Sequence, residues 1–142
     1  MDFDTTDLGG QPYVVNLEKL TKENTNYRTT KWTGTKLQMT LMSIDPEGEV
    51  GLEAHHGIDQ FLRVEQGSGK VYMGPTQDNL TFEATVEDDF AIFIPAGTWH
   101  NIVNTGDTTL KMYSIYTPPE HAKGTIHKTY EEAIEAEAEH SN

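Results

Sequence analysis

The chain has 142 residues, no cysteine and a formal net charge of −13, from 23 acidic and 10 basic residues. This length is typical of a single domain, and the absence of cysteine excludes disulfides and thiolate metal sites. The excess of acid, with no basic stripe, argues against nucleic acid and membrane surfaces as partners. The N-terminus has no secretory-signal pattern and no apolar run approaches the roughly 20 residues that cross a bilayer, so we expect a cytoplasmic protein.

Residues 1–35 are predicted to be an N-terminal arm followed by edge strands. Residues 1–12 are polar and contain Gly9, Gly10 and Pro12, which is typical of a loose terminal arm. Two edge-type strands are expected in residues 13–33, one over 13–15 and one over 27–32, with a helical turn near 17–20.

Residues 36–117 are predicted to form the barrel core. Apolar residues alternate with polar ones from Lys36 onward, which indicates half-buried strands. Strands are expected over 36–41, 50–55, 61–65, 70–73, 80–86, 90–94, 100–104 and 110–116. The glycines at 67 and 69 predict that the strands on either side form a hairpin. About eight short strands with turn signals roughly every 8–12 residues indicate an all-β sandwich or barrel.

Residues 118–142 are predicted to be a linker and a C-terminal helix within the same single domain. Pro118 and Pro119 end the strand pattern. Thr129 and Glu132 have the spacing of a capping box, and the residues that follow are rich in Ala and Glu. We therefore expect a short helix here.

The most informative stretch is residues 89–104. A buried strand leads into a turn made by Pro95 and Gly97, and His100 follows at the start of the next strand. The stretch resembles the second motif of the cupin family, G-x5-P-x-G-x2-H-x3-N. Asp89 stands at the first glycine, and every other fixed position is present, including Asn104.

Residues 48–67 resemble the first cupin motif, G-x5-H-x-H-x3–4-E-x6-G, with Gln60 in place of the glutamate. The two histidine positions fall either on Glu53 and His55 or on Ala54 and His56. Residues two apart share one face of a strand, so Glu53 and His55 would point together into the barrel. Ala54 cannot bind a metal, which favours the first register, and the second stays open.

The resemblance implies a cupin jelly roll, or double-stranded β-helix, with a divalent metal ion at the barrel mouth and pairing into a homodimer. The implied metal ligands are Glu53, His55, Gln60 and His100. Two histidines and one carboxylate are the set used by non-haem iron oxygenases, and the same donors accept Mn, Ni or Zn. An amide is a weaker ligand than a carboxylate, so Gln60 could instead hydrogen-bond a ligand or the substrate.

The function we favour is a metal-dependent enzyme with dioxygenase-like chemistry on a small oxygen-rich metabolite. One alternative is a cupin that binds a metal or metabolite without turnover. A second alternative is a sugar isomerase or epimerase, which fits less well because phosphate binding needs cations and Arg63 is the nearby one, on the other strand face.

The candidates for a catalytic group are Glu53, His121 and His127. The two histidines lie in a Pro- and Gly-rich segment after the last barrel strand. They could fold over the barrel mouth or belong to an exposed linker, and we favour the exposed linker.

Overall fold

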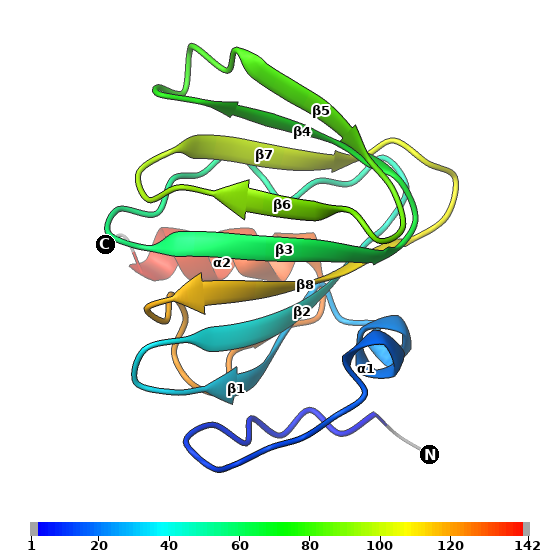
Figure 1. Cartoon of the computed structure of the whole chain (residues 1–142), viewed down its shortest axis with the longest axis vertical. Helices are drawn as coiled ribbons and strands as arrows, with labels where there is room; N and C mark the ends of the chain where they lie inside the picture. The colour runs from blue at the N-terminus through cyan, green and yellow to red at the C-terminus, as the bar shows by residue number, and fades with distance from the viewer. Residues whose placement is uncertain (1–2, 141–142) are drawn as a thin grey trace.

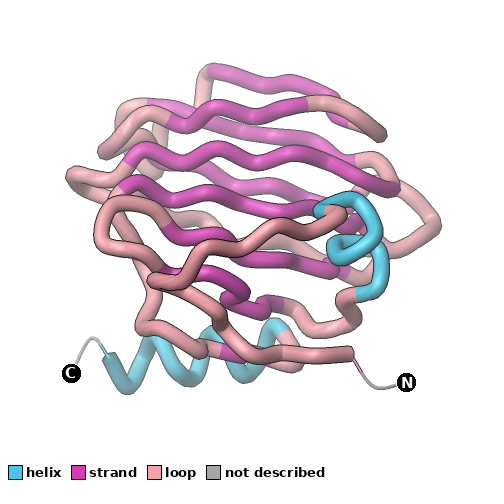
Figure 2. The backbone as a smooth tube through the Cα atoms, turned by 60° about the horizontal axis from the view of Figure 1, so that its bottom comes forward, coloured by secondary structure: helices cyan, strands magenta, loops and turns pink. Residues whose placement is uncertain are grey.

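Two antiparallel sheets face one another in the computed structural model, which describes residues 3–140 (Figure 1). The larger sheet has the strand order β6-β3-β8-β2-β1-β9 and the smaller has the order β5-β4-β7. The strands are β1 (Arg28–Thr33), β2 (Gln38–Ile44), β3 (Asp59–Gln66), β4 (Gly69–Gly74), β5 (Phe82–Val86), β6 (Ala91–Ile94), β7 (Trp99–Asn104), β8 (Leu110–Thr117) and β9 (Ile126–His127). The helices are α1 (Leu17–Glu23) and α2 (Tyr130–His140), and both lie at the periphery of the strands (Figure 2). The predicted all-β barrel with a short C-terminal helix is confirmed.

The core lies between the sheets because alternate residues of each strand point inward. Burial alternates along β4, β7 and β8, as the sequence pattern predicts. Leu62 and Val64 of β3 and Met112 of β8 are almost fully buried members of one apolar cluster.

Of the two edge strands predicted in residues 13–33, one is absent. Residues 13–15 form no strand and lead instead into α1, whose first turn is capped by the Asn16 side chain (Lys19 N–H to Oδ1, 3.1 Å). The expected edge strand over 27–32 and the helical turn near 17–20 are present as β1 and α1.

Residues 50–55 form an extended segment and not the regular strand that we predicted. Only isolated bridges join this region to β7, from Glu49 to Val103 and from Glu53 to His100. Gly51 explains the interruption, because its φ of +100° belongs to the left-handed region and breaks the pleat. The segment nevertheless runs beside β7.

The predicted hairpin between the third and fourth barrel strands is wrong. β3 pairs with β6 and β8, while β4 pairs with β5 and β7, so the two strands belong to different sheets. Both edges of β3 are occupied, and β4 therefore has no edge to join. Gly67, with a φ of +98°, turns the chain closely against Thr109 and Leu110 as it crosses to the other sheet.

The N-terminal arm is anchored, which corrects the prediction of a loose segment for the part of it that the structure describes; residues 1–2 lie outside that part. Lys31 Nζ donates to the carbonyls of Asp4 and Thr6 at 2.9 and 3.0 Å, and Trp32 Nε1 donates to Gln11 at 2.7 Å. The side chains of Lys31 and Trp32 on β1 therefore hold the arm in place. The sequence pattern predicted these residues as part of a strand and gave no sign of this contact.

The C-terminal helix begins as its capping residues predict. The Glu132 N–H donates to Thr129 Oγ1 at 3.1 Å, and Glu132 Oε2 accepts from the Lys128 N–H at 2.6 Å. Tyr130 stacks on Tyr27, with 5.7 Å between the ring centroids, which holds the helix against the barrel. Neither described helix is long and apolar enough to cross a membrane.

Candidate metal centre

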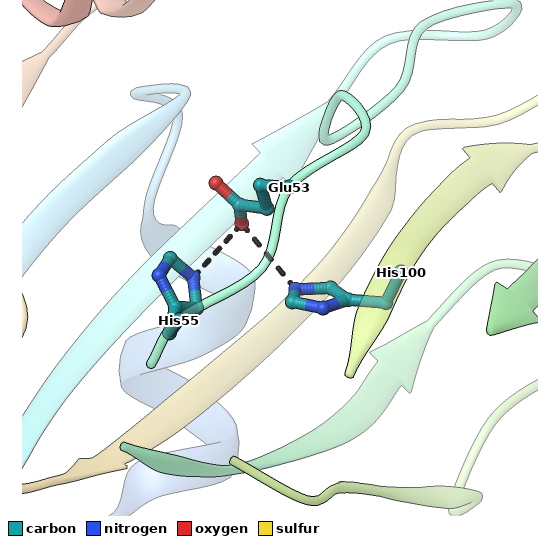
Figure 3. A group of neighbouring side chains, drawn as sticks. All are labelled: Glu53, His55 and His100. Atoms are coloured by element: carbon teal, nitrogen blue, oxygen red, sulfur yellow. Dashed lines mark ion pairs between the residues drawn. The ribbon is translucent and has the colours of Figure 1, made fainter. Parts of the chain in front are cut away.

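Three side chains of the two motifs converge inside the barrel mouth (Figure 3). Glu53 Oε1 lies 3.2 Å from His55 Nε2 and 3.5 Å from His100 Nε2. The three ligand atoms all lie within 4.8 Å of one another, so a single ion could contact all of them. We call Glu53, His55 and His100 the triad.

The backbone explains how two distant motifs bring these residues together. Glu53 and His100 exchange both backbone hydrogen bonds, at 3.0 and 2.8 Å. Gly97, in the turn before β7, has a φ of +80° and donates its N–H to the carbonyl of His55 at 2.9 Å. The Pro-x-Gly turn therefore holds the second motif against the first.

Each histidine of the triad is oriented by a second group at Nδ1, which leaves Nε2 directed toward Glu53. His100 Nδ1 lies 2.9 Å from the carbonyl oxygen of Thr98, and His55 Nδ1 lies 3.4 Å from Glu120 Oε2. Such contacts set the tautomer and the ring orientation of metal-binding histidines. Glu120 was not predicted, because it lies outside both motifs and no spacing in the sequence relates it to His55.

The ionisable side chains of the triad shift one another's pKa values. Burial opposes ionisation of Glu53, but the hydrogen bonds and charges of His100 and His55 outweigh it and hold the pKa of Glu53 well below its ordinary value. Burial lowers the pKa of His55, and the contacts with Glu120 and Glu53 outweigh it and raise that pKa to about 9. A metal ion at His55 Nε2 would therefore have to displace a proton at neutral pH.

The triad passes a test of its fitness for a cation. Glu53 Oε1, His55 Nε2 and His100 Nε2 are buried atoms that face one another at 3.2 and 3.5 Å, and none of them makes a hydrogen bond of good geometry in the described chain. Buried polar atoms nearly always make well-formed hydrogen bonds, so three at one point that have only one another as neighbours are unusual. Divalent transition metals bind to one carboxylate oxygen and two imidazole nitrogens in other metalloproteins, so this set of ligand atoms suits them.

Gln60, the fourth predicted ligand, faces the same interior. It is opposite Tyr116 in the sheet register and is 5% exposed. Its Nε2 donates to Ser114 Oγ at 2.8 Å, while its Oε1 is buried and unpaired. Its role as a ligand stays a prediction.

The structure also places the remaining candidates. His56 is exposed, whereas Glu53 and His55 both lie beside His100. The two histidine positions of the first motif therefore fall on Glu53 and His55, and not on Ala54 and His56. Arg63 lies on the outer face, where it pairs with Glu65 and Asp89 at 3.2 and 3.0 Å.

The prediction of an exposed linker is wrong for His121. Its ring packs edge-on against Tyr116, which in turn contacts His55, with centroid distances of 5.3 and 5.7 Å. Gln38 holds the linker in this position, because its Oε1 accepts from the N–H groups of Glu120 and His121 at 3.1 and 2.9 Å.

His127 is half-buried on β9, where its Nδ1 lies 2.9 Å from Arg28 Nη1. Neither His121 nor His127 belongs to the triad.

Comparison with known proteins establishes the class to which this fold and site belong. The family described as Cupin domain matches residues 40–116, more than half of the chain, and the chain belongs to that family. It is 53% identical over 131 residues to the uncharacterized protein YrkC of Bacillus subtilis (strain 168), covering 92% of this chain and 70% of YrkC. It is 38% identical over 117 residues to the uncharacterized protein L612 of Acanthamoeba polyphaga mimivirus, covering 82% and 71% of the two chains.

A solved structure similar over nearly its whole length is BH2720 of Bacillus halodurans. The two share 56% sequence identity with a TM-score of 0.91, covering 92% of this chain and 98% of BH2720. Cupins typically bind a metal ion, and the triad could hold one here.

Proposed function

We propose that this cupin is a metal-dependent enzyme that acts on a small oxygen-rich metabolite by dioxygenase-like chemistry. The observation that carries the proposal is the convergence of three buried ligand atoms within 4.8 Å of one another: Glu53 Oε1, His55 Nε2 and His100 Nε2. Glu53, His55 and His100 would hold the ion, with Gln60 as a fourth ligand or as a hydrogen-bonding group beside it. When bound, a divalent ion supplies Lewis acidity, and a redox-active one such as iron also supplies oxygen chemistry.

The residues of the chain prepare this site in three ways. Glu120 and the Thr98 carbonyl orient the two imidazoles. Tyr116 packs against the ring of His55, and His121 packs against Tyr116. The buried oxygen of Gln60 offers an acceptor for a substrate hydroxyl.

Binding of a metal or metabolite without turnover is the second candidate. It is favoured by Gln60, because an amide cannot exchange a proton at the position where the family motif carries a glutamate. The proposed enzyme and this alternative share the metal site and differ in turnover alone.

The first experiment is elemental analysis of the protein purified without chelator or an affinity metal. We expect near-stoichiometric Fe, Mn, Ni or Zn, and we expect Glu53→Ala and His100→Ala each to abolish it. His56→Ala is the matched control, since His56 is exposed and should leave the metal content unchanged. Metal loss in His56→Ala with retention in Glu53→Ala would contradict the ligand set.

Turnover is then tested by oxygen consumption with the metal-loaded protein and a panel of small hydroxy and oxo compounds. Oxygen consumption that is lost in His100→Ala supports the proposed enzyme. Tight binding of a panel member without any product supports the binding protein.

A further inference from the structure

Arg28 is a buried cation without a carboxylate partner. It is only 6% exposed, and no ion pair joins it to any carboxylate among the residues that the structure describes. Its Nη1 lies 2.9 Å from His127 Nδ1, its guanidinium stands 5.3 Å from the centre of the Tyr27 ring, and its Nε is buried and unpaired. Burial of an arginine is costly unless an anion accompanies it.

The guanidinium faces the same interior as the triad. Arg28 is opposite Met42 on β2, and Met42 lies two residues from Thr40 on the same face. Thr40 is opposite Ser114 on β8, and Ser114 lies two residues from Tyr116. Lys31 is buried as well, but it points outward to the carbonyls of the N-terminal arm.

Unpaired polar atoms mark this interior. Eight buried side-chain atoms of the described chain have no hydrogen-bond partner, and seven belong to residues of the triad or of the interior face beside it. They are Arg28 Nε, Thr40 Oγ1, Glu53 Oε1, His55 Nε2, Gln60 Oε1, His100 Nε2 and His121 Nε2, and the eighth is Glu65 Oε1. Buried polar atoms without hydrogen-bond partners, on an interior that also holds a guanidinium and a metal-ligand set, indicate a polar ligand in this interior.

His121 is a further side chain of this interior with a buried ring nitrogen that has no hydrogen-bond partner. Its ring packs on Tyr116, which contacts His55, and burial and then the charge of Arg28 lower the pKa of His121 to about 3. The imidazole is therefore neutral at physiological pH and can donate one N–H to an anion.

We infer that Arg28 and His121 bind the carboxylate of a small organic acid whose second oxygen function reaches the triad. The inference rests on the proposed function, whose substrate class it names. A carboxylate matches the planar fork of one guanidinium. A phosphate dianion carries a second negative charge and would need further cations beside the guanidinium.

The test compares pyruvate, acetoacetate and levulinate with their methyl esters by isothermal titration calorimetry. The three acids place a keto oxygen progressively farther from the carboxylate, and each ester keeps that oxygen while losing the charge. We expect one acid to bind wild-type protein at least tenfold more tightly than its ester. Equal affinity of acid and ester across the series would overturn the inference.

Substitutions at Arg28 test whether this side chain causes the difference in affinity between acid and ester. Arg28→Gln should weaken binding of the acid about tenfold or more and leave the ester unchanged, and Arg28→Lys should recover part of the loss. Arg63→Gln is the matched control, because Arg63 lies on the outer face. An unchanged acid-to-ester ratio in Arg28→Gln would overturn the inference.

If Arg28→Gln does not fold, the side-chain Nε–H resonance of Arg28 in wild-type protein decides. A shift with the acid but not with the ester supports the inference, and no shift overturns it.

Measuring both chelator-treated and metal-loaded protein separates the two proposals. Discrimination of acid from ester that depends on Arg28, in a protein that takes up no metal even when metal is supplied, would support the carboxylate site and contradict the metalloenzyme. A stoichiometric metal without such discrimination would overturn the carboxylate site and leave the metalloenzyme standing.

Discussion

At the scale of single residues, the contacts at Nδ1 of the two histidines decide how well the triad can hold an ion. Thr98 contributes a backbone carbonyl to His100, which no side-chain substitution removes. Glu120 contributes a carboxylate to His55 from the linker that follows β8. Glu120 is thus the orienting group that mutation can test.

We expect Glu120→Gln to weaken metal binding about tenfold or more, because an amide beside Nδ1 fixes the ring orientation and raises the basicity of Nε2 less well than a carboxylate does. Competition with a chromophoric chelator measures the affinity. Glu87→Gln, which removes an exposed carboxylate, is the control. Equal affinity in wild type and Glu120→Gln would show that Glu120 does not orient the ligand.

At the scale of elements, Asp7 joins three segments of the chain. Its carboxylate accepts from the Thr33 N–H and hydroxyl at 3.0 and 2.6 Å, from Gly9 at 2.9 Å and from Gly124 at 3.1 Å. The arm, the end of β1 and the linker that carries His121 are therefore tied together at one buried acid. Burial raises the pKa of Asp7, but these hydrogen bonds outweigh it and lower the pKa below its ordinary value of 3.8.

We expect Asp7→Asn to lower the free energy of unfolding by about 2 kcal/mol at pH 7, the size of a lost hydrogen bond to a charged group. Because the folded-state pKa is depressed, ionised Asp7 contributes stability above the unfolded-state pKa. That contribution disappears as the pH falls through the folded-state pKa, so the difference between variant and wild type should shrink below about pH 4.

Urea unfolding at pH 7 and at pH 3 measures both values. Asp107→Asn, at an exposed position, is the control. A destabilisation of Asp7→Asn that is the same at both pH values would contradict the role of the ionised form.

At the scale of the whole molecule, the outer face of the larger sheet carries an aromatic cluster on β6, β3 and β8. Phe93 is 70% exposed and its ring centre lies 5.0 Å from that of Phe61, which also contacts Tyr113 at 6.2 Å. A hollow of about 330 Å³ adjoins the two phenylalanines. Clustered aromatic residues on a surface are typical of interaction sites, and the predicted homodimer would bury them.

We expect Phe93→Glu to convert a dimer to a monomer, because two charges would face each other across the interface. Light scattering coupled to size-exclusion chromatography measures the mass. Phe82→Glu is the control, since Phe82 is 53% exposed on the smaller sheet. A wild-type chain that is monomeric throughout would contradict the homodimer.

Local patterns in the sequence predicted the elements and the candidate ligands. Alternation of apolar residues predicts half-buried strands, and the capping box at Thr129 predicts where α2 begins, because both depend on neighbours a few residues apart. The spacing of Pro95, Gly97 and His100 predicts a histidine directed into the barrel for the same reason. The triad was therefore accessible without coordinates.

The tertiary structure alone decided what surrounds the triad. Arg28 meets His127 across 99 positions of sequence, and Glu120 reaches His55 from a linker that carries no family motif. The separation of β3 and β4 into different sheets also depends on which strand edges are already occupied. No local period encodes contacts of this kind, because they arise when distant segments pack around one interior, and it is these contacts that supply the second end of the proposed ligand site.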